Sequence, residues 1–299
     1  MFGWLVNDRL TAIPGTRTFW NHLLDGIPGL VDKTAQPYSV LASVIESEIL
    51  LGSPDYIIRN AAYFRWLKVE CPVIAFVQDI LEGVQRTMLL EACAAARLVV
   101  FNSDYTKSMY PELASTNNQI IPIGTDETIF KPCEPYENIP DGAVLWVGSG
   151  HFIKGFDLAC ELAHKSDRPW VFVMKDDTPV DVAARVFRRI AQPQLAAVAS
   201  ACAVGVCTSR QETQHLAGIE MGMCGLPLVT TNVGVYYDRV AGSWGQVTQG
   251  YWPKEIERVS KLSGSSAANY WRSHGFGLSR CIEAWANTVA TLEDSHVVR

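Results

Sequence analysis

The chain of 299 residues is 48% hydrophobic and 19% charged, a composition that predicts a large core and about two domains. Its formal net charge is −6 at pH 7, with the excess of acids in residues 1–140, so it lacks a general electrostatic attraction for polyanions, although a local basic cleft remains compatible with it. No apolar run reaches the roughly 18 residues of a membrane span.

The eight cysteines show no C-x-x-C spacing and no clustering with the six histidines. This pattern favours buried free thiols in a reducing compartment over disulfides or zinc, so no metal site is expected. The segment Phe2–Val6 has no basic residues before it and is typical of a first strand, not of a secretory signal. We therefore expect a cytoplasmic protein.

A glycine-containing loop follows the first strand. Gly15 stands in this loop, and Phe19, Trp20 and Leu23 then recur at helical spacing. Strand, glycine loop and helix together are typical of the first βα unit of a Rossmann-like domain.

Further strands are predicted at Val40–Val44, Tyr56–Ile58 and Val73–Val77. The last of these ends at Gln78 and Asp79, and side chains at the carboxyl end of a parallel strand point toward the crevice where ligands bind. Asp79 is therefore a candidate for substrate contact. Capping of the next helix is an equally good explanation.

The chain then continues as a helix over Leu89–Ala96 and a strand over Leu98–Phe101. Ser103 or Asp104 can cap the helix that follows. Residues 133–141 hold two prolines and several acids without periodicity, which predicts a linker between two domains.

The second half opens with an apolar strand over Ala143–Val147, which continues into Gly148, Ser149 and Gly150 and then reaches Lys154. A glycine-rich turn before a helix is either a phosphate loop or only a tight turn.

The next strand, Trp170–Met174, ends at Lys175-Asp176-Asp177, whose spacing does not suit a metal-binding D-x-D. We expect Arg185, Arg188 and Arg189 to lie on one solvated face of a helix. Leu195–Ala203 is predicted as a helix that leads into the following strand.

The stretch from Val204 to Asn232 contains a strand, a polar corner, a helix and another strand. Two acids frame the corner, Glu212 and Glu220, with seven residues between them. The first N–H groups of a helix lack partners and carry partial positive charge, so this place can hold an anion, while nearby acids grip hydroxyls. A capped helix with solvated acids is the simpler alternative. Residues 255–293 are predicted as helices.

Three passages resemble the family 4 retaining glycosyltransferases of the GT-B fold. Glu212, seven residues and Glu220 resemble their E-x7-E block, and Lys154-Gly155 resembles the K-G of V-G-R-x4-K-G-x-D, with Ser149 at the arginine position. Residues 120–132 resemble I-P-N-G-V-D-x-x-x-F-x-P, with Ile123 at the asparagine position.

The resemblance implies an α/β protein of the GT-B type, in which two Rossmann-like domains with parallel sheets face a central cleft. The expected domains are an acceptor domain over residues 1–132, the linker 133–141, a nucleotide-sugar domain over 142–280, and a C-terminal helix over 281–299 that packs back on the first domain.

The implied activity is a retaining, metal-independent hexosyltransferase without a cofactor, which moves a sugar from a UDP- or GDP-sugar to a hydroxyl acceptor. Lys154 would neutralise the diphosphate, Glu212 would hold donor-sugar hydroxyls and Glu220 the ribose. The implied catalytic residues are Glu212, Lys154 and Asp79. The implied donor-binding residues are Gly15, Gly148, Ser149, Lys154, Arg210, Glu212, His215, Leu216 and Glu220.

Two other functions stay open. Ser149 and Gln78 replace an arginine and a histidine at two family positions, which is compatible with a nucleotide-sugar-binding protein that performs no transfer. Arg210, His151 or His215 would have to replace the missing cation. A viral type of glycosyltransferase acting on hydroxymethylpyrimidine bases of DNA is the other alternative, against which the acidic first half argues. A carbohydrate or small-molecule acceptor is favoured, and nucleic acid remains possible.

Overall fold

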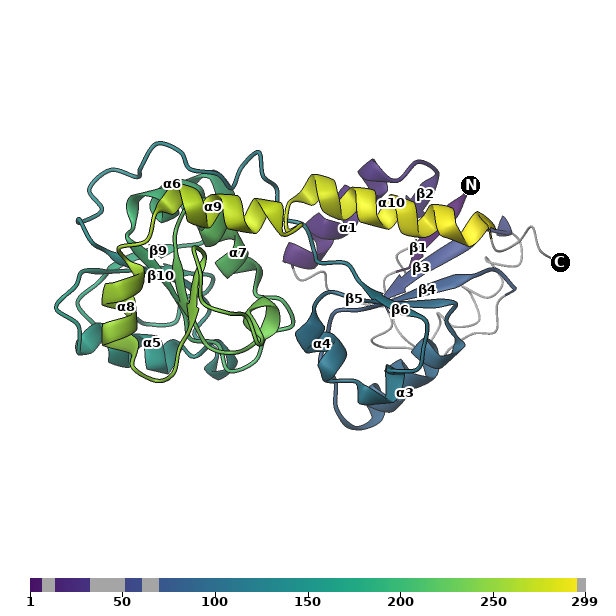
Figure 1. Cartoon of the computed structure of the whole chain (residues 1–299), viewed down its shortest axis with the longest axis horizontal. Coiled ribbons are helices and arrows are strands. Elements are labelled where there is room, and N and C mark those ends of the chain that lie inside the picture. The colour runs from purple at the N-terminus through teal and green to yellow at the C-terminus, as the bar shows by residue number, and fades with distance from the viewer. Residues whose placement is uncertain (7–13, 33–51, 61–69, 295–299) are drawn as a thin grey trace. The chain divides into compact units, whose positions relative to one another are not determined.

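The computed structural model describes residues 1–6, 14–32, 52–60 and 70–294, which form two compact units (Figure 1). The N-terminal unit comprises Met1–Gly124 and Ser279–Arg299, and the C-terminal unit comprises Thr125–Leu278. The first boundary falls after Gly124, eight residues before the expected 132, and the second falls after Leu278, two residues before the expected 280. The predicted strand Val40–Val44 lies outside the described residues.

The N-terminal unit is built on a sheet of six parallel strands in the order β2-β1-β3-β4-β5-β6. The strands are β1 (Gly3–Val6), β2 (Leu30–Asp32), β3 (Tyr56–Asn60), β4 (Val73–Val77), β5 (Leu98–Phe101) and β6 (Asn118–Ile120). The strands β1, β3, β4 and β5 are buried along their whole length, as expected of apolar runs in a parallel sheet covered on both faces.

Helices cover both faces of this sheet. They are α1 (Pro14–Gly26), α3 (Gly83–Ala95), α4 (Asp104–Ser108), a 3-10 turn (Pro111–Leu113) and α10 (Leu278–Asp294). Leu89 and Cys93 of α3 pack in one cluster with Val77 and its neighbours. On the other face, the ring of Phe76 meets Trp20 of α1 at 5.7 Å and Trp285 of α10 at 5.3 Å. Alternation along β4 thus separates the two layers.

The cap of α4 is settled by the structure. The hydroxyl of Ser103 accepts a hydrogen bond from the N–H of Thr106 at 3.0 Å, so Ser103, and not Asp104, is the N-cap. Asp104 occupies the first turn, where a negative charge suits the helix dipole.

The C-terminal unit is built on a second sheet of six parallel strands, in the order β12-β11-β10-β7-β8-β9. The strands are β7 (Val144–Gly148), β8 (Trp170–Met174), β9 (Arg185–Arg188), β10 (Val204–Cys207), β11 (Leu228–Thr230) and β12 (Gly245–Val247). If β7 is counted as strand 1 of the unit and the sheet is read from β9, this order is 3-2-1-4-5-6, the doubly wound Rossmann arrangement. The strand order reverses between β7 and β10.

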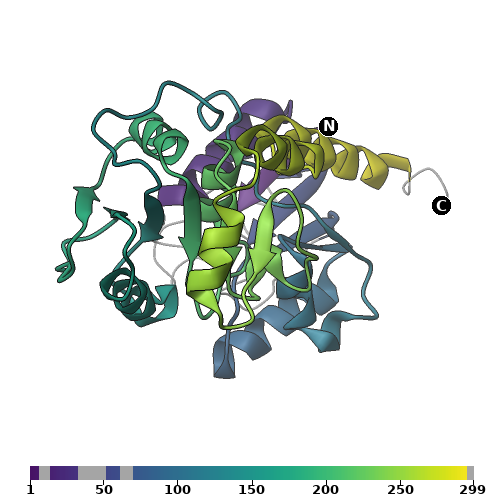
Figure 2. The same ribbon diagram turned by 60° about the vertical axis from the view of Figure 1, so that its left-hand side comes forward.

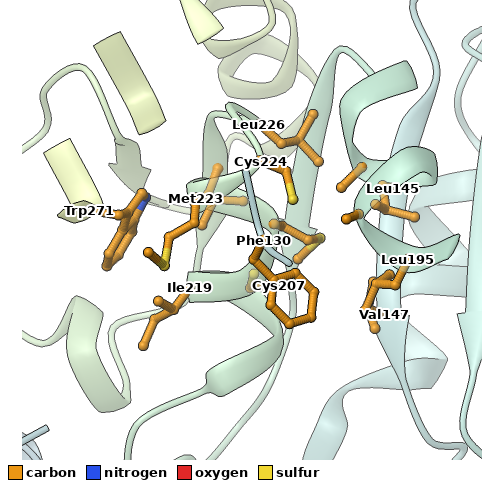
Figure 3. Packing of buried hydrophobic residues seen from close by; sticks show 14 of the residues in the cluster. Phe130, Leu145, Val147, Leu195, Cys207, Ile219, Met223, Cys224, Leu226 and Trp271 are labelled. Carbon is orange, nitrogen blue, oxygen red and sulfur yellow. The ribbon is translucent and has the colours of Figure 1, made fainter. Parts of the chain in front are cut away.

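Two helical layers cover this second sheet. The helices are α5 (Phe156–His164), α6 (Gln192–Ala201), α7 (Leu216–Met223), α8 (Trp252–Val259) and α9 (Gly264–Ser273), with 3-10 turns at Phe152–Lys154 and Gly234–Tyr236. Leu145 and Val147 face α6, α7 and α9, and the ring of Phe130 lies in the same cluster (Figure 3). Val144 and Trp146 face α5 and α8. The helix α8 lies against β11 and β12 (Figure 2).

The prediction of a helix around Arg185, Arg188 and Arg189 was wrong. Residues 185–188 form β9, the edge strand, paired with β8 from Val171↔Arg185 to Met174↔Arg188. Val186 and Phe187 pack into opposite hydrophobic clusters, so the period is that of a strand. The spacing of the three arginines therefore does not indicate a helix.

No helix in the described parts of the chain combines the length and the apolar content that crossing a bilayer demands.

Candidate functional site

Two loops of the C-terminal unit meet at the point where its strand order reverses. One follows β7 and the other follows β10, and these strands are parallel neighbours, so both loops leave the sheet at its carboxyl edge. The N–H of Arg210 donates to the carbonyl of Ile153 at 2.8 Å, and the hydroxyl of Thr208 donates to the carbonyl of Gly155 at 2.8 Å. Ligands of doubly wound sheets bind at such a reversal.

Gly155 makes this close approach possible. It has φ +65°, in the left-handed region, and a Cβ atom there would overlap the carbonyl of Thr208. Only glycine meets both conditions without strain. The sequence therefore places Lys154 directly beside the β10 loop because the next residue has no side chain.

Lys154 and Glu212 form the centre of the site. The Nζ of Lys154 lies 2.7 Å from Oε1 of Glu212, and the hydroxyl of Ser209 donates to the same oxygen at 2.8 Å. The Nε2 of His215 lies 3.7 Å from it. The side chain of Glu212 is 10% exposed and that of Lys154 is 38% exposed, so the ammonium keeps access to solvent while the carboxylate is nearly enclosed.

The charges at this centre follow from its burial. Burial alone would raise the pKa of Glu212, but the attraction of His215 and Lys154 and the hydrogen bonds from Lys154 and Ser209 outweigh it and lower that pKa. Burial lowers the pKa of His215 to about 4, against the opposing attraction of Glu212. At pH 7 His215 is therefore neutral, and Lys154 is the group that balances the ionised Glu212.

His215 is held in an unusual backbone conformation. It has φ +71° and ψ +65°, which is uncommon for a residue with a side chain, and it is the N-cap of α7. Its Nδ1 lies 3.0 Å from the hydroxyl of Tyr236. A Cβ at Gly218 would overlap that hydroxyl, so Gly218 leaves the space that this contact needs. Nothing in the sequence pattern singled out Tyr236.

At the start of α7 there are N–H donors without an acceptor, and an acid without a hydrogen-bond partner, within the described residues. Among the described residues, none accepts a hydrogen bond from the N–H of Leu216 or Ala217, the first two residues of the helix. The half-buried carboxyl of Glu220, one turn further on, makes no hydrogen bond or ion pair within the described parts of the chain. Burial raises the pKa of Glu220, and the charge of Lys175 acts in the opposite direction.

Lys175 supplies a second positive charge that the motif comparison did not identify. It directly follows β8, its N–H donates to the carbonyl of Gly148 at 2.8 Å, and its side chain is exposed. Its charge acts on Glu220 and on His215. Its place at a strand end was the available signal, since β8 is next to β7 in the sheet.

The other predicted donor-binding residues of this unit lie in or beside the two loops. Gly148 is the last residue of β7, and Ser149 follows it. Arg210 binds Asp157 through two bonds of 2.7 Å each, and its guanidinium lies 3.8 Å above the ring of Phe152. These contacts favour a role for Arg210 in holding the β7–α5 loop, instead of a role as a spare cation.

Two predicted site residues belong to the N-terminal unit. Gly15 lies in the first turn of α1 and not in a loop, and residues 7–13 before it are outside the described residues. Asp79 follows β4, and its carbonyl accepts a hydrogen bond from the hydroxyl of Tyr110 at 2.8 Å. The N-cap of α3 is Glu82, so Asp79 does not cap that helix. Within the described residues, no three His, Cys, Asp or Glu side chains are grouped as metal ligands.

Comparison with known proteins finds similar solved structures. No family model and no curated protein matches the sequence. Sucrose-phosphate synthase from Thermosynechococcus elongatus matches with a TM-score of 0.73 at 14% identity, covering 99% of this chain and 100% of that one. Anabaena HepE in complex with UDP-glucose matches with a TM-score of 0.72 at 15% identity, covering 97% and 100%. The lipopolysaccharide outer core galactosyltransferase WaaB matches with a TM-score of 0.75 at 12% identity, covering 97% and 99%. The protein therefore has the GT-B fold, with an α/β architecture of two parallel six-stranded sheets, as the sequence predicted.

Proposed function

We propose that the protein is a retaining glycosyltransferase, similar to family 4, which transfers a hexose from a UDP- or GDP-sugar to a hydroxyl acceptor without a metal ion. The proposal rests on one observation above all. Lys154 and Glu212 pair on the two loops that meet where the strand order of the C-terminal sheet reverses, and α7, which begins directly after the β10 loop, carries Glu220. The structural neighbour HepE was solved with UDP-glucose.

The diphosphate would lie between the start of α7 and two lysines. The N–H groups of Leu216 and Ala217 point along a helix dipole that favours an anion, and Lys154 and Lys175 supply full charges. Lys175 would then replace the positive charge of the family's arginine, whose position Ser149 occupies. Groups fixed in advance stabilise the charge that develops on the leaving diphosphate without reorganising during the reaction.

The two acids would hold hydroxyls. The carboxylate of Glu220 can accept hydrogen bonds from both ribose hydroxyls. Glu212 would bind hydroxyls of the donor sugar through the oxygen that faces away from Lys154 and Ser209. In the reaction, the bond between the anomeric carbon and the phosphate oxygen breaks while the acceptor oxygen bonds to the same face of that carbon. The departing phosphate takes the hydroxyl proton, so no separate base is needed. Asp79 would contact the acceptor from the N-terminal unit.

Nucleotide binding tests the donor site. Thermal shift with UDP-, GDP-, ADP- and TDP-sugars, with and without Mg²⁺, should show a shift for one nucleotide that does not depend on metal. Lys154→Ala and Lys175→Ala should each weaken its affinity by about 10- to 100-fold, because each removes a charged hydrogen bond to phosphate. Lys165→Ala, which alters an exposed lysine at the end of α5, is the matched control and should bind as the unaltered protein does. Equal affinity in all three variants would contradict the site.

Transfer must be tested separately from binding. A nucleotide-sugar-binding protein without transfer activity is the second candidate, because one oxygen of Glu212 is already held by Lys154 and Ser209. Release of nucleotide in the presence of an acceptor panel, with the anomeric configuration of the product determined by NMR, separates the two. A product of retained configuration supports the proposal, and an inverted product would exclude it. Binding without any product would favour the second candidate.

A further inference from the structure

Three buried amide side chains at the carboxyl edge of the N-terminal sheet have polar atoms without a hydrogen-bond partner among the described residues. Asn60 ends β3, while Gln78 and Asn102 directly follow β4 and β5. Their exposed fractions are 1%, 6% and 0%. The Nδ2 of Asn60, the Nε2 of Gln78 and both polar side-chain atoms of Asn102 have no partner among the described residues.

Strand register places the three amides on one face of the sheet. Asn60 pairs with Phe76, and Gln78 follows Phe76 by two residues, so both lie on the same side of the pleat. Val77 pairs with Phe101, and the N–H of Asn102 donates to the carbonyl of Val77 at 3.3 Å, which sets Gln78 beside Asn102. The amides therefore come from three neighbouring strands and share one face.

The helices α1 and α10 cover this face. Phe76 contacts Trp20 of α1 and Trp285 of α10, and the fully buried indole N–H of Trp285 also lacks a partner among the described residues. Gln119 lies on the same face, in register with Val100, and shows the usual outcome for an amide there. Its Nε2 bonds to the hydroxyl of Thr288 on α10 at 2.5 Å.

Such a group of unpartnered amides is costly to the fold. Buried polar groups are nearly always hydrogen-bonded, and each exception needs an explanation. These amides lie at the carboxyl edge, next to the reversal of strand order between β1 and β3, where ligands of parallel sheets bind. The charged neighbour Arg59 lies on the opposite face, toward α3, where its charge acts on Cys93. The face with the amides thus offers neutral donors and acceptors together.

We propose that Asn60, Gln78 and Asn102 form a binding site for an uncharged, hydroxyl-rich part of the acceptor, such as a sugar ring. A hydroxyl both donates and accepts, as an amide does, so a group with several hydroxyls can bond to both the NH₂ and the oxygen of an amide. A phosphate or carboxylate would find no cation among these three side chains. This inference rests on the proposed function, since it gives the transferase its class of acceptor.

Stability of the unliganded protein is the first test. An apolar side chain of similar size removes the unsatisfied group, so Gln78→Met and Asn102→Leu should each raise the melting temperature by about 2–4 °C. Gln119→Met, which breaks the bond to Thr288, should lower it. A fall for Gln78→Met and Asn102→Leu as well would overturn the proposal, because the amides would then serve the fold through ordered water.

Saccharide binding is the second test. Saturation-transfer NMR with glucose, galactose and maltose should give a signal with the unaltered protein and with Gln119→Met, but at least a tenfold weaker one with Gln78→Met and Asn102→Leu. Glucose 6-phosphate and glucuronic acid should bind more weakly than glucose. No signal with any neutral saccharide, an unchanged signal in the Gln78 and Asn102 variants, or stronger binding of the charged sugars would each overturn it.

The two proposals fail in different ways. In the two proposals, nucleotide sugars bind Lys154 and Lys175 of the C-terminal unit, whereas free saccharides bind the amides of the N-terminal unit. Loss of the nucleotide shift alone would remove the proposed function and leave a saccharide site. Loss of the saccharide signal alone would remove the amide site and leave the transferase.

Discussion

The carboxyl edges of the two sheets use opposite chemistry. Both sheets have six parallel strands. The strand order reverses between β1 and β3 in the first sheet and between β7 and β10 in the second. In the C-terminal unit the edge carries charges that already bind one another, with Lys154 and Ser209 both on Glu212. In the N-terminal unit, one face of that edge carries neutral amides whose side-chain NH₂ groups have no partner among the described residues.

The difference follows from the cost of burial. An isolated buried charge costs far more than an unpaired amide, so a charged edge must be paired before a ligand arrives. Neutral amides can stay without hydrogen bonds until a ligand binds, because each unsatisfied amide group costs roughly 1–3 kcal/mol. The charged edge therefore suits a diphosphate, which can compete for Lys154, and the neutral edge suits hydroxyls.

The largest expected effect comes from the glycine that brings the charged loops together. Gly155→Ala adds a Cβ that overlaps the carbonyl of Thr208 at a left-handed backbone position, and we expect the free energy of unfolding to fall by about 3 kcal/mol. Urea denaturation measures this. Gly250→Ala is the control, because Gly250 has φ +94° but no atom within 4 Å of the added Cβ. Equal losses in the two variants would show that backbone strain alone accounts for the effect.

Acid should weaken the charged unit through His215. The folded pKa of about 4 lies below the unfolded value of 6.5, so between these values the unfolded chain binds more protons. Stability from this group is complete above pH 6.5 and is lost as the pH falls toward 4. Between pH 7 and pH 5 the free energy of unfolding should fall by about 2 kcal/mol, measured by urea denaturation at the two pH values.

A variant without the titrating ring isolates this contribution. Asparagine tolerates the left-handed backbone of position 215 better than most residues, so His215→Asn keeps the loop while removing the proton site. Its stability should change little between pH 7 and pH 5. An unchanged pH dependence in His215→Asn would assign the acid sensitivity to other groups.

Much of this architecture could be predicted from the sequence, because the strands are short apolar runs that end at polar corners. The runs at Val73–Val77 and Trp170–Met174 became β4 and β8 with the same bounds. Lys154 and Glu212 were selected by motif, and the structure places them 2.7 Å apart. The local sequence pattern was sufficient for features that depend on a single strand or motif.

Long-range pairing was not predictable in the same way. The strand β9 depends on pairing with β8, which overrides the helical spacing of its arginines. Tyr236 reaches His215 across 21 residues, and no spacing rule connects them. The relation of Asn60, Gln78 and Asn102 needs the register of three strands. Each of these features exists only once the sheet has formed.

The smallest expected effect separates the two acids of the E-x7-E block. Glu212→Gln loses its ion pair with Lys154 and should lower the free energy of unfolding at pH 7 by about 1–2 kcal/mol. Glu220→Gln replaces a carboxyl that has no hydrogen bond or ion pair within the described chain, and should leave stability unchanged or raise it by about 1 kcal/mol or less.

The stability changes in Glu220→Gln and Glu212→Gln should depend on pH. Because burial raises the folded pKa of Glu220, its ionisation costs stability as the pH rises above 4.5, so the gain in Glu220→Gln should be largest at pH 7 and vanish near pH 4. Because the pKa of Glu212 is lowered, its ionised form adds stability above pH 4.5, and the loss in Glu212→Gln should shrink only as the pH falls below 4.5. Equal destabilisation by both changes at pH 7 would mean that Glu220 has a structural partner. The contrast between paired and unpaired polar groups would then hold between the two units, but not between Glu212 and Glu220.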